Sequence, residues 1–590
     1  MQVGDFILGR MAEWGVNRVF GYPGDGINGM LGAFQRQDKI RFIQVRHEES
    51  AAFMAGAHAK FTGETGVCLA TSGPGAIHLL NGLYDARMDH QPVVALIGQQ
   101  ARTALGSSYQ QEVDLMSLFK DVASEYIQMV TVPDQARMVI DRAFRIARER
   151  KTVTAVILPR DVQEEKAVVV PEREHGKVVT DAGRTESILQ PTEQELEKAA
   201  RILNESERVA ILVGAGAFGA EKEIQEVAET LGAGVAKALL GKMVLPDHLP
   251  YVTGSIGMLG TKPSWEMMDN CDCLLMIGSS FPYAEYLPEP GKARGIQIDI
   301  DASKLGIRYP MELNLLGDSK LTLKALLPKL VYKIDRKWRD KIENWVAEWG
   351  ETVQKRALKP ADPINPQRVI MELSQLLPQR SIVTADSGTS AFWYARNLVS
   401  QEGMKGSLSG NLASMCPAVP YAIAAKFAFP DRLAVALVGD GAMQMLCMNE
   451  LITVAKYWRE WVDPRLLVVV LNNRDLNMVT WEQRILSGEP KYEASQNIPD
   501  VPYAEFAKLI GLEGIRVEND EDITPALAKL IDADRPAVLD VVTDPNVPVI
   551  PSHINREQLS NFFKAIMKGD SDQLPMIRQT VRELMKGGIG

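Results

Sequence analysis

Short apolar runs alternate with longer segments of helical periodicity along most of the chain. Over the first 161 residues the runs "RFIQV", "GVCLAT", "PVVALIG" and "TAVILP" alternate with helical segments. The same pattern returns around "RVAILVG", "CLLMIGS" and "GIQIDID", and again around "SIVTAD", "LAVALVG", "LLVVVLN" and "AVLDVVT". This alternation is typical of parallel sheets covered by helices. It predicts the α/β class, with three doubly wound α/β domains.

Two segments interrupt this alternation and predict linkers. Residues 163–190 gain charge and lose the alternation, and Pro191 with the helix start "TEQE" follows them. The Pro-rich stretch "ALKPADPINP" precedes the third set of strands. We therefore place the domains at 1–162, 191–332 and 366–544. A polar tail with one late helix is expected over 545–590.

Composition narrows the class of protein. The 590 residues are 46% hydrophobic and 24% charged, and no apolar run approaches the roughly 18 residues that a bilayer span requires. The amino terminus lacks the pattern of a secretory signal, and the five cysteines are odd in number and scattered, which predicts reduced thiols in a cytoplasmic protein. The net charge of −10 opposes nucleic-acid binding. Chemistry on small molecules is therefore expected.

Polar residues follow two neighbouring apolar strands of the third domain. Gly439, Asp440 and Gly441 come directly after "LAVALV", and Asn472 and Asn473 end "LLVVVLNN". The carboxyl ends of such strands form the ligand-binding edge of a doubly wound sheet. Glycines allow close approach to a phosphate, a following helix offers its N-terminus, and carboxylate and amide oxygens suit Mg²⁺. The sequence therefore predicts a diphosphate site with a magnesium ion.

This constellation resembles the diphosphate-binding motif of thiamine diphosphate enzymes. The resemblance implies that Asp440, the side chain of Asn473 and the backbone carbonyl of Asp475 bind Mg²⁺. It also implies that Met415 supports the bent cofactor. Further residues match positions that line the diphosphate or the cofactor rings: Gly388, Thr389, Gly439, Gly441, Ala442, Met443 and Asn473.

The segment "QVRHEESAAFMAGAHAKFTG" resembles the part of these enzymes that supplies a carboxylate to the cofactor's pyrimidine. The matching residue is Glu48, at the end of "RFIQV", where a carboxyl can be desolvated and held partly protonated. The resemblance makes the first domain pyrimidine-binding and the third diphosphate-binding. Because the family builds its site from two subunits, it implies a homodimer or homotetramer.

The middle domain carries a dinucleotide fingerprint, Gly214-x-Gly216-x-x-Gly219, after a strand. An NAD site would also place an acid after the next strand, where this chain has Lys237. The domain is similar instead to the FAD-binding domain of pyruvate oxidases. That similarity implies five FAD neighbours: Gly214, Gly216, Gly278, Asp299 and Asp318. The alternative is a nucleotide fold whose site is empty or structural.

The resemblance is closest to pyruvate oxidases. It implies decarboxylation of a 2-oxo acid, with pyruvate expected, and electron transfer through FAD to oxygen or quinone. Gln111 matches a glutamine of the family motif "Phe-Gln-Glu", although Gln110 replaces its phenylalanine. Glu482 stands where oxidases carry a glutamate and acetohydroxyacid synthases a tryptophan. Asp25 matches a proton-transferring acid of decarboxylases.

Other readings stay open. In "NMVT", Asn477 and Met478 replace the Gly-Phe of oxidases and resemble the synthases' "GMVT", so a carboligase with non-redox or absent FAD is the main alternative. A simple decarboxylase ranks third, since no two histidines are adjacent. A non-catalytic binding protein is disfavoured because Glu48, Asp440 and Asn473 are all present.

The tail contains one amphipathic segment, "LPMIRQTVRELMKGG". On a helix, Ile577, Val581 and Leu584 share one face, and Arg578, Arg582 and Lys586 share another. Such a helix fits either packing on its own subunit or peripheral contact with the inner face of a membrane.

Overall fold

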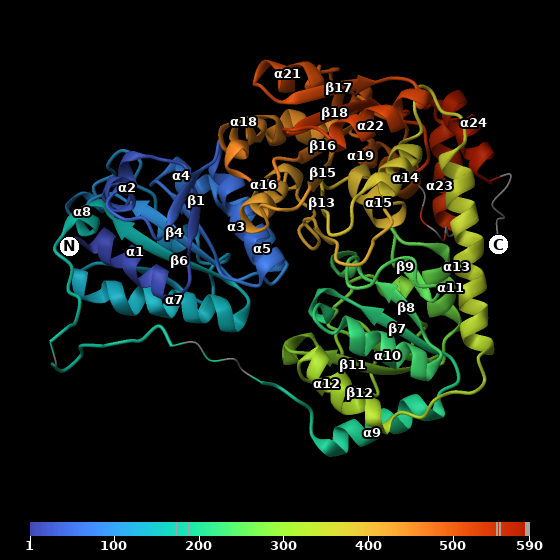
Figure 1. Cartoon of the computed structure of the whole chain (residues 1–590), viewed down its shortest axis with the longest axis horizontal. Coiled ribbons are helices and arrows are strands. Elements are labelled where there is room, and N and C mark those ends of the chain that lie inside the picture. Colours follow the sequence, from blue (N-terminus) through green and yellow to red (C-terminus); the bar gives the residue numbers. More distant parts are fainter. Residues whose placement is uncertain are drawn as a thin grey trace.

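The computed structural model describes all residues except 173, 184, 186, 187, 550, 552, 554, 555 and 585–590. Within it the chain forms three sheets, each with six parallel strands. Figure 1 shows the first domain in blue, the second in green and the third in orange and red. The predicted class, three α/β domains, is confirmed.

The first sheet has the strand order β2-β1-β3-β4-β6-β5. Its strands are β1 (Arg18–Gly21), β2 (Arg41–Gln44), β3 (Gly66–Ala70), β4 (Val93–Gln99), β5 (Ile127–Met129) and β6 (Val153–Pro159). Every residue of β3, β4 and β6 is buried, as expected for strands covered on both faces. The covering helices are α1 (Val3–Glu13), α2 (Asn28–Gln35), α3 (Glu48–Thr62), α4 (Pro74–His78), α5 (Leu80–Met88), α6 (Leu115–Leu118), α7 (Ala136–Arg150) and α8 (Arg160–Glu164).

The second sheet has the order β12-β11-β10-β7-β8-β9, which is the dinucleotide-binding order of a doubly wound fold. Its strands are β7 (Val209–Val213), β8 (Gly234–Lys237), β9 (Val252–Ser255), β10 (Cys273–Ile277), β11 (Arg294–Asp299) and β12 (Leu313–Leu316). Its helices are α9 (Glu193–Glu205), α10 (Glu221–Leu231), α11 (Lys262–Asn270) and α12 (Ser319–Leu326). Thr192 and Glu195 form a capping box at the start of α9, so the helix start expected after Pro191 is confirmed.

The third sheet, β14-β13-β15-β16-β18-β17, repeats the strand order of the first. Its strands are β13 (Ile382–Ala385), β14 (Lys405–Ser407), β15 (Ala434–Gly439), β16 (Leu466–Asn472), β17 (Glu513–Val517) and β18 (Ala537–Val542). Its helices are α14 (Pro366–Leu376), α15 (Thr389–Arg396), α16 (Ala418–Ala428), α17 (Asp440–Ala442), α18 (Met448–Tyr457), α19 (Asn477–Glu482), α20 (Glu493–Gln496), α21 (Tyr503–Leu509) and α22 (Ile523–Ile531). Two π-helical turns interrupt these helices, at Met443–Cys447 and Gln483–Ser487.

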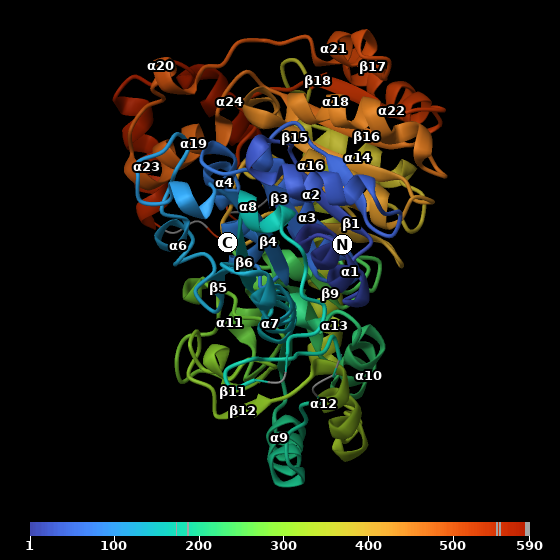
Figure 2. The same ribbon diagram turned by 90° about the vertical axis from the view of Figure 1, so that its left-hand side faces the viewer.

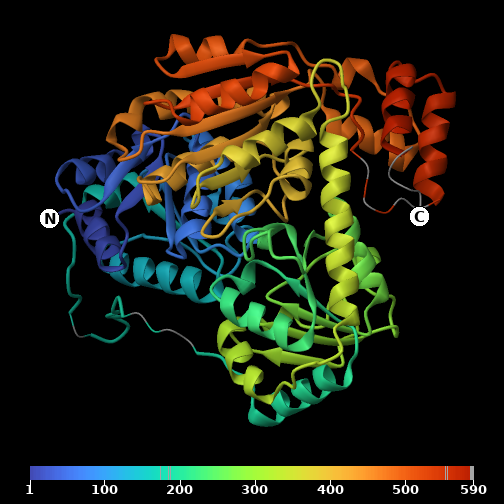
Figure 3. The same cartoon turned by 45° about the vertical axis from the view of Figure 1, so that its right-hand side comes forward.

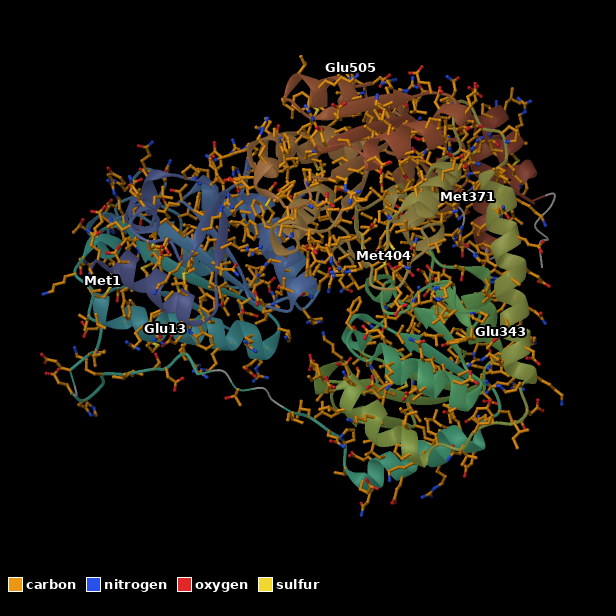
Figure 4. The ribbon with its side chains drawn as sticks, viewed as in Figure 1. Met1, Glu13, Glu343, Met371, Met404 and Glu505 are labelled. Carbon is orange, nitrogen blue, oxygen red and sulfur yellow. The ribbon has the colours of Figure 1, made fainter. Side chains whose placement is uncertain are left out.

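The domains are joined in two different ways. The chain leaves the first domain after α8 and enters the second at α9, whereas the long helix α13 (Lys337–Ala357) runs from the second domain to the third (Figures 1 and 3). Met404, which is 5% exposed, lies where the third domain approaches the second (Figure 4). There the fully buried Lys237 donates to Asp247 (2.5 Å) and to Ser400 (3.1 Å).

A buried polar cluster joins the first domain to the third. Lys60 Nζ, at the end of α3, donates to Asp89 Oδ2 (2.7 Å) and to Tyr421 Oη of α16 (2.6 Å). Asp89 also accepts from the backbone N–H groups of Gly410 (3.0 Å) and Asn411 (2.9 Å), and from Asn411 Nδ2 (2.8 Å). We call these residues the Asp89 cluster. It holds α3 against α16, and both helices lead directly into the predicted site.

The tail differs from the single late helix expected from the sequence. It contains two helices, α23 (Arg556–Met567) and α24 (Gln573–Leu584), which lie against the third domain near the upper end of α13 (Figures 1 and 3). The first was overlooked because "REQLSNFF" mixes polar and apolar residues without a strong cap signal. Both helices pack on their own chain.

Candidate active site

The carboxyl edge of the first sheet gathers the residues predicted there. Glu48 begins α3, directly after β2, and is 7% exposed. Its Oε2 lies 3.0 Å from Nδ1 of His78, at the end of α4. His47 caps α3 by accepting from the backbone N–H of Glu49 (3.2 Å). Burial, together with the neighbouring His78, lowers the pKa of His47. The carboxyl of Glu48 is therefore buried at the start of α3, in contact with the imidazole of His78.

The loop after β3 passes between Glu48 and Gln111. A Cβ on Gly73, whose φ is +60°, would lie 2.9 Å from Gln111 Cβ, and one on Gly75 would lie 3.1 Å from Glu48 Oε1. Only glycine fits this approach. At the start of the same loop, Thr71 Oγ1 accepts from the N–H of Gly26, next to Asp25 (3.0 Å). The switch point between β1 and β3 thus brings Asp25, Glu48 and Gln111 to one loop.

The third sheet presents the predicted metal ligands at the ends of β15 and β16. Asp440 is 3% exposed and accepts from the backbone N–H groups of Gly441 (2.9 Å) and Arg474. Burial raises the pKa of Asp440 to about 7. A carboxylate that is hard to ionise when buried gains most from a nearby cation. This donor set suits Mg²⁺.

The two asparagines at the end of β16 differ in burial and in their hydrogen-bond partners. Asn472 is buried and its Nδ2 donates to Asp500 and Asp540 (both 3.0 Å), so its role is structural. Asn473 is partly exposed, and its Oδ1 accepts from the N–H of Asp475 (3.1 Å). Asn473 therefore offers an amide oxygen beside Asp440.

The carboxylate of Asp475 is already engaged by other side chains. It accepts from Asn477 Nδ2 (2.9 Å) and Thr480 Oγ1 (2.9 Å), and Lys491 Nζ lies 3.3 Å away. Its backbone carbonyl accepts from the N–H of Asn477 (2.7 Å) and retains a second lone pair.

An anion cradle lies at the switch point of the third sheet. Gly388, with φ +83°, caps α15, which begins at Thr389. The Ser390 hydroxyl is buried, has no hydrogen-bond partner among the described residues, and lies 3.5 Å from where a Gly439 Cβ would be. A buried, unpaired hydroxyl at a helix N-terminus fits a phosphate oxygen. Ala442 and Met443, also predicted here, are buried in the helix that follows Asp440.

Met415 closes this side of the site from a loop with an unusual backbone. Ala413 and Cys416, on either side of it, have φ of +54° and +79°. Met415 Cε lies 3.4 Å from the position of a Gly441 Cβ. Asp386 fixes the loop by accepting from the N–H of Cys416 (2.9 Å), and burial raises the pKa of Asp386 to about 7. The strained loop therefore holds the thioether over the Gly-Asp-Gly turn.

The first and third domains also touch beside Met415. Nδ2 of Asn81, on α5, donates to Glu49 Oε1 (2.7 Å) and to Ser414 Oγ (2.8 Å), next to Met415. Figures 1 and 2 both show α3 of the first domain next to α16 of the third. Sequence reasoning did not single out Asn81 or His78, whereas Asp386 and Ser390 bound the turn in which it expected Gly388 and Thr389 to line the diphosphate or the cofactor rings.

Glu482 lies outside the predicted metal set. It ends α19, is half-buried, and has a raised pKa because of burial. With Met258, Phe392 and Met478 it lines a small apolar cavity. Met478 Cβ is 3.8 Å from the position of a Gly388 Cβ. Glu482 is therefore one helical turn from the anion cradle.

The predicted FAD residues all lie at the carboxyl edge of the second sheet. A Cβ on Gly214 would lie 2.4 Å from Gly278 O, and one on Gly216 would lie 2.8 Å from Gly278 Cα, so these glycines pack on one another. Asp299 ends β11 and its pKa is raised by burial. Asp318 caps α12 by accepting from Leu321 N–H (2.9 Å). The glycine contacts are required by the fold itself, with or without a nucleotide.

Only part of the amphipathic helix predicted in the tail can be followed. Met576, Gln579 and Thr580 are buried, and Ile577 is 37% exposed. The side chains of Val581, Arg582 and Leu584, and the whole of Lys586, lie outside the described part of the chain. Among the described residues, no helix has the length and apolar character needed to cross a bilayer.

Comparison with known proteins matches all three domains to thiamine pyrophosphate enzyme models. The N-terminal TPP binding domain matches residues 1–118, the central domain 196–326 and the C-terminal TPP binding domain 386–541. A Bacillus subtilis protein, YdaP, named as a candidate thiamine pyrophosphate-containing protein, is 35% identical over 582 residues, 97% of this chain and 98% of its own. Pyruvate oxidase of Lactiplantibacillus plantarum is 30% identical over 92% of this chain and 89% of its own. The acetolactate synthase large subunit of Cyanidium caldarium is also 30% identical, over 95% and 97%.

Proposed function

Because the chain belongs to the thiamine pyrophosphate enzyme family, we propose that it decarboxylates a 2-oxo acid, with pyruvate as the expected substrate, using thiamine diphosphate and Mg²⁺. The observation that carries this proposal is the pair of buried carboxyls, Glu48 at the carboxyl edge of the first sheet and Asp440 at that of the third. A non-catalytic binding protein would need neither the proton-transferring group nor its alignment with a metal site.

The chain's own residues have distinct tasks in this proposal. When bound, thiamine diphosphate supplies a nucleophilic carbon and an electron sink for the loss of CO₂. Glu48 holds and returns a proton at the pyrimidine, and His78 steadies its carboxyl. Met415 supports the bent cofactor from below. The N-terminus of α15 and the Ser390 hydroxyl hold the diphosphate.

Asp440, the side chain of Asn473 and the backbone carbonyl of Asp475 hold Mg²⁺ in this proposal. Asp25 and Gln111, at the loop beside Glu48, orient the substrate and move its protons.

We favour an oxidase, which passes two electrons from the decarboxylated substrate through FAD to oxygen or quinone. Glu482, half-buried beside the anion cradle with a pKa raised by burial, supports this choice, because it stands where the resemblance places a glutamate of oxidases. FAD would lie at the carboxyl edge of the second sheet, at Gly214, Gly216, Gly278, Asp299 and Asp318. The strand order of this sheet supports a nucleotide there.

A carboligase of the acetolactate synthase type is the second candidate. The segment "NMVT" favours it, because Met478 lies against Gly388 at the cradle. In that case a second carbonyl compound would receive the two-carbon unit, and FAD would be structural or absent. The relatives support the two reactions at the same identity.

An anaerobic spectrum separates the two candidates. The purified protein with thiamine diphosphate and Mg²⁺ is mixed with pyruvate, and the visible flavin band is followed together with CO₂ release. Bleaching on the timescale of turnover supports the oxidase. A flavin that stays oxidised, or no flavin, with an accumulating C–C bonded product supports the carboligase. Unchanged pyruvate after long incubation would refute both.

We also propose a homodimer or homotetramer in the cytoplasm, with peripheral membrane contact through the tail. Exposed apolar side chains on elements of the site, Ile77 (46% exposed) and Met445 (63%), support an assembly. On the tail, Phe563 (54%), Met567 (79%) and Leu574 (75%) support a membrane contact. Light scattering and vesicle co-sedimentation test these two proposals separately.

A further inference from the structure

The tail helices pack against the segment that carries Glu482. We call residues 556–584, which comprise α23, α24 and the turn between them, the tail hairpin. Phe562 of α23 stacks on Trp481 with ring centroids 6.4 Å apart, and Asn561 Nδ2 donates to the carbonyl of Leu486 (2.9 Å). The π-helical turn Gln483–Ser487 therefore lies directly under the tail hairpin.

A buried carboxylate of the tail hairpin makes the strongest of these contacts. Asp570, in the turn between the helices, is 1% exposed. It accepts from Nε and Nη2 of Arg484, at 2.8 Å and 2.7 Å, and from the backbone N–H groups of Lys491 (2.9 Å) and Asp572 (3.0 Å). Although burial opposes its charge, the bonds from Arg484 and Lys491 lower the pKa of Asp570. Arg484 itself is fully buried.

The same contacts continue to the proposed metal loop. Nη2 of Arg484 also bonds Asp572 (2.9 Å). Lys491 Nζ lies 3.8 Å from Asp572 and 3.3 Å from Asp475, and its side chain is only 7% exposed. Charges of opposite sign thus alternate from the tail hairpin to Asp475, which follows Asn473 by two residues.

We propose that the tail hairpin positions the metal loop through Asp570, Arg484 and Lys491. Lys491 holds the Asp475 carboxylate, together with Asn477 and Thr480, so that its backbone carbonyl faces the metal. Without Asp570, the buried guanidinium of Arg484 would lose its main partner and compete for the remaining carboxylates, including Asp475. Such partners behind a ligand set the ligand's orientation. This inference rests on the Mg²⁺ site of the proposed function.

Two substitutions and a matched control test this role in the full-length protein. Asp570→Asn removes the charge that holds Arg484, and Lys491→Gln cuts the link to Asp475 while leaving the Asp570–Arg484 pair intact. Glu489→Gln is the control, because Glu489 pairs with Lys568 across the same interface but is half exposed. The measurement is the Mg²⁺ concentration that gives half-maximal thiamine diphosphate binding in equilibrium dialysis.

We expect both test variants to need about tenfold more Mg²⁺, or more, and to recover full cofactor binding at saturating Mg²⁺. The control should match the wild type. Circular dichroism identifies a variant that fails to fold; if Asp570→Asn fails, Lys491→Gln decides the outcome. Half-saturation of Lys491→Gln at the wild-type Mg²⁺ concentration would overturn the proposal. A wild-type protein that binds neither Mg²⁺ nor thiamine diphosphate would instead refute the proposed function.

Discussion

Replacement of Asp89 by asparagine should loosen the contact that brings the two halves of the site together. The carboxylate of Asp89 accepts from four N–H donors, one of them the ammonium of Lys60. Although burial opposes its ionisation, Lys60 and these donors lower the pKa of Asp89, so it is charged at neutral pH. An amide keeps one acceptor oxygen and turns an NH₂ group towards buried donors. Lys60 then retains only Asp85, at 3.8 Å, as a carboxylate partner.

The expected cost follows from the burial of both partners. Removing one member of a buried ion pair costs about 3–5 kcal/mol. With a denaturant slope of about 3 kcal/mol per molar urea, this lowers the midpoint of the first unfolding transition by about 1–2 M. Tryptophan fluorescence in urea measures the midpoint, and thiamine diphosphate binding should weaken in parallel.

Asp121→Asn is the control for this experiment, because the Asp121 side chain is 74% exposed and also pairs with an arginine, Arg87. Its midpoint should stay at the wild-type value. If Asp89→Asn unfolds at the same urea concentration as Asp121→Asn, the Asp89 cluster does not hold α3 against α16, and the reasoning is refuted.

Three further predictions concern the site. Glu48→Gln should abolish turnover of any 2-oxo acid and slow the exchange of the cofactor's acidic C–H proton, which NMR in D₂O measures. Mg²⁺-dependent cofactor binding should persist. Full activity of this variant would refute the role of Glu48. Asp440→Ala, or removal of Mg²⁺ by a chelator, should abolish thiamine diphosphate binding in equilibrium dialysis, and unaltered binding would contradict the metal site. Burial raises the pKa of Asp386 from 3.8 to about 7. The protonated carboxyl therefore stabilises the fold fully below pH 4, and this contribution to the free energy of unfolding, at most about 4 kcal/mol, is lost as the pH rises to about 7. Asp386→Asn should therefore lose less stability than the wild type between pH 4 and 8 in urea titrations, and parallel pH profiles would count against this explanation.

The fold class was accessible from sequence because each buried parallel strand is a short, continuous apolar run. The runs "PVVALIG" and "LLVVVLN" became β4 and β16, with every residue buried. The short strands β5 and β14, at or near the sheet edges, left no comparable run, since their residues are half-exposed or few. The helix α23 was missed because its stability comes from packing on the third domain rather than from its own sequence pattern.

Candidate site residues that directly follow an apolar strand could be identified from the sequence. Residues that reach the site through tertiary contacts between helices and loops were harder to identify. Asp440 and Asn473 follow apolar strands, so their meeting could be expected from topology. The partners His78 and Asn81 lie on helices, and only the docking of α5 on the loop of Ser414 gives Asn81 its place. Likewise Arg484 and Asp570, 86 residues apart, show no common signal in the sequence.

The π-helical turn Met443–Cys447 joins two helical stretches whose positions are fixed by different neighbours. Asp440 is held by the end of β15, whereas α18 is held by the first domain through Glu450, which accepts from the N–H of Arg46 (2.9 Å). A π turn accommodates one residue more than an α-helix of the same rise, and each residue turns an α-helix by about 100°. In evolutionary terms, this turn is the place where the helix can gain or lose a residue without rotating either end. Alignments of relatives should therefore concentrate one-residue gaps within 443–447, and homologues that lack the extra residue should keep both flanking segments in the same orientation.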